Sequence, residues 1–574
     1  MLELYENFCY NYKDKIKPIG VTGMSMKYVI KYKSAGEVIT TNETENDFYS
    51  LDITENADRY TVVLNPKKDF ELVDFYAETD FEFVKNDWFF AGGYQSWTKS
   101  REFQCNHIQR GVNKISKIHP LASHAAKLFG DQYIVDYSEV PGEFHSHCYT
   151  YIRNGKKVKL FGSLSEKTGF TYFKVKMNDN YFSIHKDVLG KLVTEPYTVF
   201  DIVYYEGGYE EVFDKYFAKF DMPETRHGLM TGYTSWYNYF QKIDEKIILR
   251  DLEGLNCAKN EVNIFQIDDG YETFVGDWLD HCEKFPNGMK YVAEKVHAKG
   301  YKAGIWIAPF SCQRVSRTAK EHPDWLIKDE NGKPQIGCIG WGGAYTLDIY
   351  NDEAREYIKH FFDVILNDWN YDMVKLDFLY SQCISPRNGK CRGEIMYDGM
   401  KLLRECVGDK LLLGCGIPMS AAIGVCDACR ISCDVDLTYK GKIYNHIHVN
   451  NEMLSAQSAI NNSIFRRHLN GRVFMNDPDV FFLRNHNLKF NWEQKHLLAR
   501  INNLFGNVLF VSDNAGEFNK KQIEYLKKYF KKTGEVVKSA EYLDDEIIRI
   551  EIDDNGKDKV LEFNLKRGEI IRDN

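Results

Sequence analysis

Eight short apolar segments, each about the length of a β-strand, follow one another after Gly228. They are Leu229–Trp236, Val262–Asp268, Lys302–Ala308, Met373–Phe378, Leu411–Cys415, Cys429–Val435, Arg472–Asn476 and Asn507–Val511. Amphipathic helical patterns separate most of them, at Glu245–Lys259, Met289–Ala298, Asp352–Asn367, Glu394–Val407 and Trp492–Leu504. Strands that alternate with helices form a parallel sheet, which is either a closed (β/α)8 barrel or an open, doubly wound sheet.

Polar residues gather where these segments end, and their distribution favours the barrel. They are Ser235, Asp268, Asp269, Asp377, Cys415, Asp434, Asn476, Asp477, Ser512 and Asp513. An open sheet concentrates its polar groups at one switch point. A barrel brings the carboxyl ends of all its strands to one face, where its active site lies. We therefore predict an α/β fold built on a (β/α)8 TIM barrel.

Alternating polar and apolar runs on both sides of the barrel predict two β-domains. Short runs broken by Asn, Asp and Gly fill residues 1–222, which predicts an N-terminal β-sandwich. Met222–Arg226 reads as the boundary, and the barrel is expected to occupy residues 228–532. Alternation resumes in residues 535–574, which predicts a small C-terminal antiparallel sheet.

Composition narrows the partners of the chain. Its 74 Lys and Arg residues against 83 Asp and Glu residues give a net charge of -9, and no basic cluster interleaves with aromatic residues. We therefore expect no nucleic-acid partner. The N-terminus lacks a long apolar core and the least polar stretch, Leu411–Cys429, is interrupted by glycine, so we expect no membrane span. The 14 cysteines then read as reduced thiols of a cytoplasmic protein. The oligomeric state stays open.

The fourth strand, read MVKLDFLY, places two charges inside an apolar run. Alternate residues of a strand face the same side, so Lys375 and Asp377 share a face. Such charges must be paired, solvated or functional. In the functional interpretation Asp377 is a nucleophile, and Lys375 lowers its pKa and keeps it ionised. In the alternative interpretation the two residues form a self-sufficient pair inside the barrel.

The sixth strand offers a second carboxylate. Its alternation predicts that Arg430, Ser432 and Asp434 share one face. Strands four and six lie near each other across a barrel mouth, so Asp377 and Asp434 can act as the carboxylate pair that cleaves a glycosidic bond. Because a cation beside Asp434 would favour its ionised form, which does not suit a general acid, we expect Arg430 to face the substrate or another carboxylate.

Two adjacent carboxylates, Asp268 and Asp269, end the second strand. Neighbouring carboxylates repel each other unless each has donors. Sugar hydroxyls are such donors, and Mg²⁺ or Ca²⁺ is the rival partner. Trp236, Trp306 and Trp97 stand at or near strand ends, where their rings can stack on a pyranose, although a lone Trp is more often part of a core.

Several segments of the chain resemble glycoside hydrolase family 36, above all its shorter bacterial α-galactosidases, the melibiases. They are TGYTSWYNYFQ, FQIDDGYETFVGDW, KFPNGMKYVAEKVHAKGYKAGIWIAPF, EHPDW, VKLDFLY, GCGIPMSAAIG, CRISCDVD and NDPDVFFLR. They run in order along almost the whole predicted barrel. Gly92–Trp97, read GGYQSW, resembles the loop by which the β-sandwich of that family reaches over the barrel mouth.

The resemblance implies a role for each matching residue. It implies that Asp377 is the nucleophile, Asp434 the acid/base, and Asp268 and Asp269 the ligands of the axial and primary hydroxyls of galactose. The residues implied to complete the pocket or form its walls are Lys375, Trp306, Cys415, Arg430, Trp236 and Trp97. The family also implies retention of anomeric configuration and no metal or other cofactor.

Two features depart from the family pattern. Ser432-Cys433 stands where many members have Gly-Pro, just before the implied acid/base. Cys426, Cys429 and Cys433 form a C-x2-C-x3-C pattern that, with Cys415, admits a zinc or iron–sulfur interpretation. Such spacing also arises by chance in a cysteine-rich chain, and His446 and His448 read as loop residues rather than ligands.

The function expected from this reading is hydrolysis of terminal α-linked galactose from oligosaccharides such as melibiose and raffinose, by a retaining double displacement. α-N-acetylgalactosaminidase activity is an alternative, because Cys415 and Gly416 are expected to line the space beside the second carbon of the sugar. Transglycosylation on the same scaffold is another alternative. A non-catalytic sugar-binding protein is the alternative from a different class, and the presence of both Asp377 and Asp434 counts against it.

Overall fold

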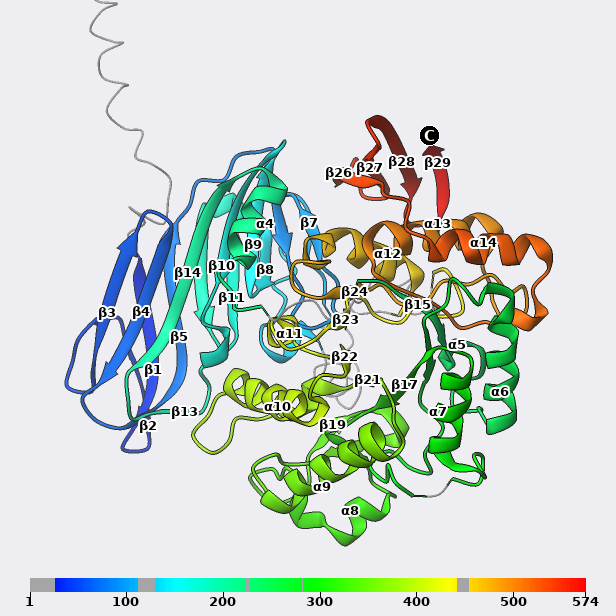
Figure 1. The fold of residues 1–574 in the computed structure, drawn as a ribbon. Coiled ribbons are helices and arrows are strands. Elements are labelled where there is room, and N and C mark those ends of the chain that lie inside the picture. Colours follow the sequence, from blue (N-terminus) through cyan, green and yellow to red (C-terminus); the bar gives the residue numbers. More distant parts are fainter. Residues whose placement is uncertain (1–25, 112–129, 223–227, 281, 441–453) are drawn as a thin grey trace, which may run out of the picture.

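The computed structural model describes residues 26–111, 130–222, 228–280, 282–440 and 454–574. Two facing antiparallel sheets form one side of the molecule, a ring of strands and helices forms the other, and a small sheet covers the top (Figure 1). His446, His448, most of Met222–Arg226 and the N-terminal residues 1–25 lie outside the described residues.

The eight predicted strands form one parallel sheet in the order β24-β23-β22-β21-β17-β16-β15-β25. Their bounds are β15 Met230–Thr234, β16 Ile264–Ile267, β17 Lys302–Ile307, β21 Met373–Leu376, β22 Leu411–Gly414, β23 Ala428–Arg430, β24 Met475–Asp477 and β25 Val508–Val511. The two end strands meet where the Asn507 amide donates to the Asn476 carbonyl at 3.0 Å. The predicted (β/α)8 barrel is confirmed.

Helices cover the outside of the barrel, as the amphipathic patterns predict (Figure 1). They include α6 Glu245–Gly254, α7 Gly288–Ala298, α9 Asp352–Asp363, α10 Arg392–Val407, α12 Ala456–Phe465, α13 Trp492–Phe505 and α14 Lys520–Phe530. Side chains cap several N-termini: Asp244 accepts from the Ile247 amide and Asn351 from the Ala354 amide. A three-stranded sheet of β18 Ser311–Gln313, β19 Ile336–Cys338 and β20 Ala344–Thr346 lies between β17 and β21 in sequence.

The N-terminal sandwich consists of two sheets that pack face to face. One has the order β2-β1-β5-β12-β11-β8 with β13 beside β5, and the other has the order β3-β4-β14-β10-β9-β6-β7. The bounds are β1 Lys27–Ser34, β2 Glu37–Thr41, β3 Tyr49–Asn56, β4 Arg59–Pro66, β5 Phe70–Asp80, β6 Trp88–Ala91, β7 Arg101–Phe103, β8 Glu143–His147, β9 Tyr149–Asn154, β10 Lys157–Ser163, β11 Thr171–Lys176, β12 Tyr181–Lys186, β13 Lys191–Val193 and β14 Tyr197–Gly207. The interior of the sandwich is a hydrophobic core of its own.

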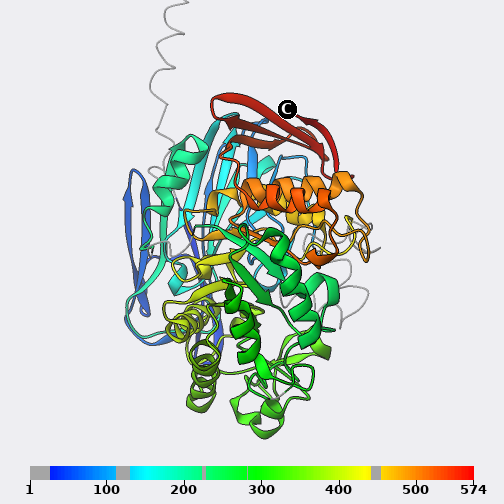
Figure 2. The same cartoon turned by 45° about the vertical axis from the view of Figure 1, so that its right-hand side comes forward.

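Four antiparallel strands close the chain: β26 Val536–Tyr542, β27 Ile547–Asp554, β28 Lys557–Asn564 and β29 Glu569–Asp573. Figure 2 shows this sheet above the helices α12 and α13. Tyr542 joins it to α12, because its ring stacks on Phe465 at 5.2 Å and its hydroxyl donates to Asn461 at 2.6 Å. The predicted C-terminal sheet therefore shares the core of the barrel.

Residues 92–100 form a loop, called here the insertion loop, that leaves the sandwich and enters the barrel mouth. The Ser96 amide donates to the carbonyl of Ile417, which follows β22, at 2.9 Å. Arg466, only 2% exposed, fixes this loop from the barrel side. Its five N–H groups bond the carbonyls of Gly93, Gln95, Ser96 and Ile431 and the hydroxyl of Ser100.

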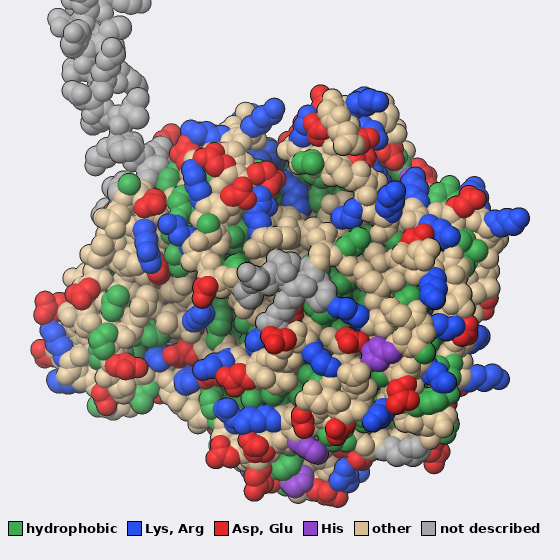
Figure 3. All heavy atoms as spheres, viewed as in Figure 1, with side chains coloured by type: hydrophobic (Ala, Val, Ile, Leu, Met, Phe, Trp, Pro, Cys, Tyr) green, Lys and Arg blue, Asp and Glu red, His purple; other side chains and the backbone are tan. Residues whose placement is uncertain are grey.

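The surface mixes both signs of charge. On the face seen in Figure 3, Lys and Arg side chains are interspersed with Asp and Glu side chains over the sandwich and the barrel alike. Within the described residues, every helix is too short or too polar to cross a lipid bilayer.

Candidate active site

Asp377 lies in a buried corner directly after β21. Its side chain accepts a hydrogen bond from the indole Nε1 of Trp306 at 3.1 Å and another from the amide of Phe378 at 2.8 Å. The backbone of Phe378 has φ 54°, a left-handed conformation that is rare for a bulky residue. Asp377 itself is 8% exposed. Two fixed donors thus orient one carboxylate at the end of a barrel strand, where chemistry is expected.

Lys375 pairs with Asp268 rather than with Asp377. Its Nζ lies 2.8 Å from Asp268 Oδ2, and both side chains are buried. Burial opposes the charge of Lys375, but Asp268 outweighs it and raises the pKa of the ammonium group above its ordinary value. Lys375 therefore does form a lysine–aspartate pair inside the barrel. Its partner, however, is Asp268, which directly follows β16, and not Asp377.

Lys375 does lower the pKa of Asp377, as predicted, but burial acts more strongly with the opposite sign. The pKa of Asp377 therefore lies above its ordinary value. The sequence indicated the cation but not its partner. Because Asp268 neutralises Lys375 directly, less of the positive charge is felt at Asp377.

Asp268 and Asp269 each have their own donors, as two adjacent carboxylates require. Asp268 accepts from Gln266 Nε2 at 2.8 Å as well as from Lys375. Asp269 accepts from Gln241 Nε2 at 2.9 Å and from the indole of Trp341 at 3.0 Å. Burial raises the pKa of Asp269, and burial beside Asp269 raises that of Glu272 well above its ordinary range. The hydrogen bond between Glu272 and Asp269 offsets part of the rise in the pKa of Asp269.

The sixth strand ends earlier than predicted, and this changes the position of Asp434. β23 stops at Arg430, so the expected alternation of Arg430, Ser432 and Asp434 on one strand face is wrong. The Ser432 hydroxyl instead donates to the backbone carbonyl of Cys433 at 2.9 Å, as in a turn. Asp434 lies on the segment that follows, with its side chain 34% exposed.

Arg430 gathers three carboxylates, and Asp434 is one of them. Its guanidinium lies 2.9 Å from Asp434, 3.3 Å from Asp477 and 3.1 Å from Asp479. The expectation that Arg430 faces another carboxylate instead of Asp434 is therefore wrong in part. A guanidinium that is 3% exposed needs several counter-charges, and the carboxylates within reach include Asp434.

Cys415 links the two candidate catalytic carboxylates. Its thiol is 1% exposed, and its pKa is raised by burial first and then by the charges of both Asp377 and Asp434. Lys375 and Arg430 act on the same thiol with the opposite sign. Cys415 is therefore close to the β21 side and to the β23 side at once. The structure brings Asp377, Asp434, Lys375, Arg430 and Cys415 into one region at the carboxyl edge of the barrel.

Comparison with known proteins places part of the barrel beside a known family. The model of the family described as Melibiase matches residues 234–391, which run from the end of β15 to the N-terminus of α10 and include Asp268, Asp269, Lys375 and Asp377. Over this part of the barrel the chain is similar to the melibiases.

Among curated relatives, α-galactosidase Mel36A of Lactobacillus acidophilus is 26% identical over 314 residues, which cover 53% of this chain and 40% of that protein. The A type blood α-D-galactosamine galactosaminidase of Flavonifractor plautii is 29% identical over 208 residues, covering 33% of this chain and 19% of that protein. The matches thus span less than half the length of these relatives.

Among solved structures, the α-galactosidase TtGalA of Thermus thermophilus in complex with p-nitrophenyl α-D-galactopyranoside has the same fold. Its TM-score is 0.69 at 22% identity, and the alignment covers 92% of this chain and 98% of that chain. The likeness concerns the architecture from the sandwich to the C-terminal sheet.

The three tryptophans named from the sequence divide into two groups. Trp306 donates to Asp377, and Trp97 of the insertion loop packs its edge on Phe378 at 5.2 Å and on Tyr380 at 5.8 Å. Both therefore border the corner that holds Asp377. Trp236 begins the short helix α5 Trp236–Tyr239 and packs its edge on Phe240 at 5.1 Å.

Several residues of the candidate site were not assigned to it from the sequence. They are Gln241, Glu272, Trp341, Asp477 and Asp479, with Tyr237, whose hydroxyl donates to Asp479. Acidic residues at the end of the seventh strand, in NDPD, were a usable signal. Trp341 lies in the loop between β19 and β20, where nothing in the local pattern indicates that it reaches Asp269.

The cysteine pattern has a plain structural outcome. Cys415, Cys426, Cys429 and Cys433 are all buried free thiols, and burial raises the pKa of each. Within the part of the chain that the structure describes, the only cluster with metal-ligand geometry is made of Asp131, His145 and His147. The zinc or iron–sulfur interpretation of the cysteines therefore has no geometric support there.

Proposed function

We propose that the protein is a retaining exo-α-galactosidase that releases terminal α-linked galactose from oligosaccharides such as melibiose and raffinose. The observation that carries the proposal is the convergence of Asp377 and Asp434 on Cys415 at the carboxyl edge of a barrel that is similar to the melibiases. The bound galactoside of the T. thermophilus structure and the name of the L. acidophilus relative support the same substrate class.

In this mechanism Asp377 attacks the anomeric carbon while Asp434 protonates the departing oxygen. The bond to the leaving oxygen breaks as the bond to Asp377 forms, which gives a covalent galactosyl-enzyme. Water, deprotonated by Asp434, then attacks the same carbon and releases galactose with its configuration retained. Two carboxyl groups about 5–5.5 Å apart suit this double displacement, whereas about 6.5–9.5 Å suits inversion.

The surroundings of each carboxylate fit these roles. The indole of Trp306 and the amide of Phe378 hold Asp377 with two donors and leave the rest of the group to face the sugar. Asp434 must alternate between ionised and protonated forms beside Arg430. Because Asp477 also pairs with Arg430, the buried guanidinium keeps a counter-charge when Asp434 takes up a proton.

Asp268, Asp269 and the tryptophans supply binding in this proposal. The two aspartates accept hydrogen bonds from neighbouring hydroxyls of galactose, and Lys375 supplies the counter-charge of Asp268 at 2.8 Å. Trp97, Trp306 and Trp236 offer apolar faces to the ring. No step requires a metal or another cofactor.

The first experiment is the turnover of an aryl α-galactoside by the Asp377→Ala variant. We expect turnover to be lost while the circular dichroism spectrum stays that of the wild type. Asp363→Ala, which removes an exposed carboxylate on α9, is the matched control and should keep full activity. Wild-type rates in Asp377→Ala would refute the nucleophile assignment, and a β-anomer as the first product in NMR would refute retention.

A second candidate, α-N-acetylgalactosaminidase activity, is favoured by the galactosaminidase among the relatives. It needs room beside the second carbon of the sugar, where Cys415 and Gly416 are expected. The space beside Gly416 is already narrow, since a Cβ there would lie 2.9 Å from the Trp97 ring and 3.0 Å from the Phe378 amide. We therefore expect the aryl α-galactoside to be the better substrate, and side-by-side assays decide.

Transglycosylation and plain sugar binding are tested in the same assays. An acceptor sugar that lowers the yield of free galactose would identify a transferase, and sugar binding without hydrolysis would identify a binding protein. The cytoplasmic location and the oligomeric state stay predictions, to be tested by cell fractionation and by light scattering.

A further inference from the structure

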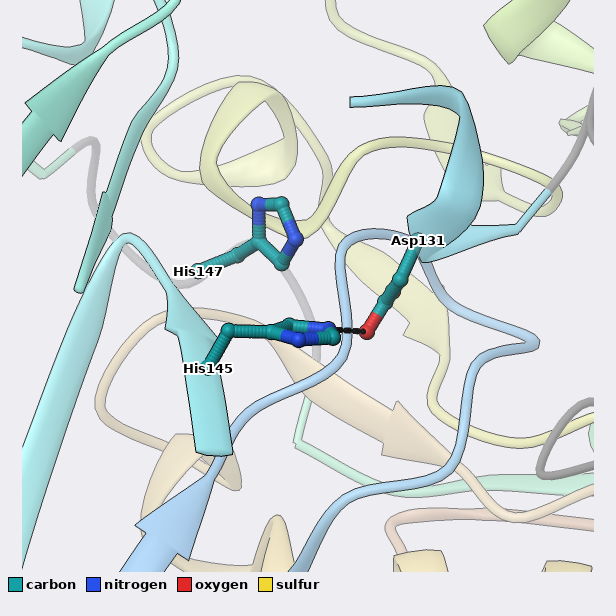
Figure 4. A group of neighbouring side chains, drawn as sticks. All are labelled: Asp131, His145 and His147. Atoms are coloured by element: carbon teal, nitrogen blue, oxygen red, sulfur yellow. Dashed lines mark hydrogen bonds and ion pairs between the residues drawn. The ribbon is translucent and has the colours of Figure 1, made fainter. Parts of the chain in front are cut away.

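Outside the barrel mouth, three potential metal ligands meet between the sandwich and the insertion loop. His145 and His147 stand two residues apart on β8 and share one face, while Phe144, which precedes His145, packs into the sandwich core. Asp131 comes from the short 3-10 helix Asp131–Tyr133. Figure 4 shows the three side chains pointing toward one another. One donor atom from each lies within 4.8 Å of the others, and all three residues are buried.

His147 is the observation that calls for a ligand. Its side chain is buried, with the residue 5% exposed, and neither of its ring nitrogens has a hydrogen-bond partner among the residues that the structure describes. Buried polar atoms in proteins nearly always have a partner, and a histidine with two orphaned nitrogens needs a specific explanation. An ion bound by one of these nitrogens would provide it.

The chemistry of the three side chains suits a cation. The cluster presents one carboxylate and two imidazoles, all buried, and ligands of these kinds bind a metal ion in their unprotonated forms.

We propose that Asp131, His145 and His147 form a binding site for a divalent transition-metal ion, and that the ion is zinc. Two imidazoles and a carboxylate are a common zinc donor set, and a water molecule completes a tetrahedral site. Two donors at about 2.1 Å from one tetrahedral ion are about 3.4 Å apart, so donor atoms that now lie within 4.8 Å of one another must close by up to about 1.4 Å. The ion takes the place of the proton between His145 Nε2 and Asp131 Oδ2, which are 2.9 Å apart.

A cavity beside the site gives an ion a way in, and the positive charges near the site are partly compensated. His145 also lines a cavity of about 380 Å³ that opens among Tyr172, Lys174 and Asp136. This cavity offers a route for the ion and space for the water ligand. Of the two cations that act on His147, Arg392 is neutralised by both oxygens of Asp187, and burial lowers the pKa of Lys174.

The ion would act on the structure of the insertion loop. The Tyr94 amide donates to Asp131 Oδ1 at 2.6 Å, and the His147 amide donates to the Gly92 carbonyl at 2.9 Å. Both ligating segments thus hold the root of the loop that carries Trp97. A zinc ion that joins them would stiffen this loop without touching the sugar.

The experiment is metal analysis of the full-length protein. We would strip the protein with a chelator, reload it with ZnCl2, remove free ions by gel filtration and measure zinc by mass spectrometry. We expect one zinc per chain in the wild type and less than a tenth of that in His147→Gln. His185→Gln is the matched control, because it removes a buried histidine of β12 that stacks on Tyr172 and lies outside the cluster.

Cobalt substitution and heating give readouts that do not depend on activity. Wild-type protein loaded with CoCl2 should show the visible bands of tetrahedral cobalt without a thiolate charge-transfer band, and its melting temperature should rise with ZnCl2. Equal zinc in His147→Gln and wild type, a thiolate band, or wild-type protein that takes up no zinc would overturn the proposal. If His147→Gln fails to fold, the cobalt spectrum of the wild type alone decides.

Discussion

The two candidate catalytic carboxylates stand in opposite surroundings at the same barrel edge. Asp377 directly follows a strand, is 8% exposed, and has two neutral donors in Trp306 and Phe378. Asp434 follows a strand that ends four residues earlier, its side chain is 34% exposed, and its partner is the charged Arg430. The difference suits a pair in which one member stays fixed against the sugar and the other exchanges protons with water.

The largest loss of activity is expected when Asp377, the carboxylate held by two donors, is replaced. Asp377→Ala should lower kcat by on the order of 10⁴-fold or more, as removal of a nucleophile does. The loss should be the same for raffinose and for an aryl galactoside with a good leaving group, because both need the nucleophile. Steady-state kinetics on the two substrates check this. A loss that depends strongly on the leaving group would assign Asp377 to acid catalysis instead.

A smaller loss of activity, which depends on the substrate, is expected when the more exposed Asp434 is replaced. Asp434→Ala should slow raffinose hydrolysis by about 10²–10⁴-fold, the usual contribution of general acid–base catalysis. The loss should be milder with a good leaving group, which departs without a proton. Added azide should restore turnover and give a galactosyl azide with the configuration of the substrate, visible by NMR. An azide of inverted configuration would reverse the two assignments.

The buried pair next to Asp377 should control stability. Lys375→Met leaves Asp268 charged and unpaired, which costs about 3–5 kcal/mol of the free energy of unfolding. Urea unfolding measures the change. Adding Asp268→Asn to the same chain should recover most of the loss, because the uncompensated charge is then gone. Equal stability of Lys375→Met and wild type would mean that Asp268 finds other donors.

Trp306, whose indole donates to Asp377, should affect the pH profile of kcat/KM. Trp306→Phe removes the indole N–H that lowers the pKa of Asp377, so this pKa should rise further. Since the ionised form is the nucleophile, the acidic limb of kcat/KM should move to higher pH, with a loss of about tenfold at low pH. Trp325→Phe, whose indole donates to Glu353 instead, is the control and should leave the limb in place.

The last prediction concerns Asp479, one of the three carboxylates around Arg430, and the pH dependence of stability. Burial, with the charges of Asp434 and Asp477, raises the pKa of Asp479 to about 7 despite Arg430. The folded state therefore binds a proton that the unfolded chain has released, so the contribution of Asp479 to stability falls as pH rises from about 4 to about 7. Relative to wild type, Asp479→Asn should gain up to about 1.4 kcal/mol per pH unit in this window. Urea unfolding at pH 5 and pH 7 tests the sign.

The same contrast explains how much the sequence could predict. All eight barrel strands overlap the predicted apolar segments, because burial on both faces gives parallel strands a continuous apolar signal. That signal predicts the position of Asp377, which lies at the end of such a segment. It does not predict the position of Asp434. The residues after Arg430 form a turn in which the Ser432 hydroxyl contacts the carbonyl of Pro478, a residue that follows another strand.

Contacts between segments that are far apart in the sequence account for the other differences between the predictions and the structure. The sequence cannot tell that Lys375 prefers Asp268 over Asp377, since strand alternation fixes only the face and not the neighbour across the barrel. It cannot tell that Trp341 reaches Asp269, because a loop with three glycines around one Trp has no periodicity to read. The resemblance to a family named the roles of residues, but not the three carboxylates around Arg430.

The bonds of Arg466 to the insertion loop bear on how such chains can evolve. A guanidinium whose partners are mostly backbone oxygens of the sandwich cannot lose that sandwich without becoming a solitary cation in an apolar interior. We therefore expect a barrel whose amino-terminal half has been exchanged for an unrelated module to be less stable than the intact chain, although the interior of the sandwich has a hydrophobic core of its own.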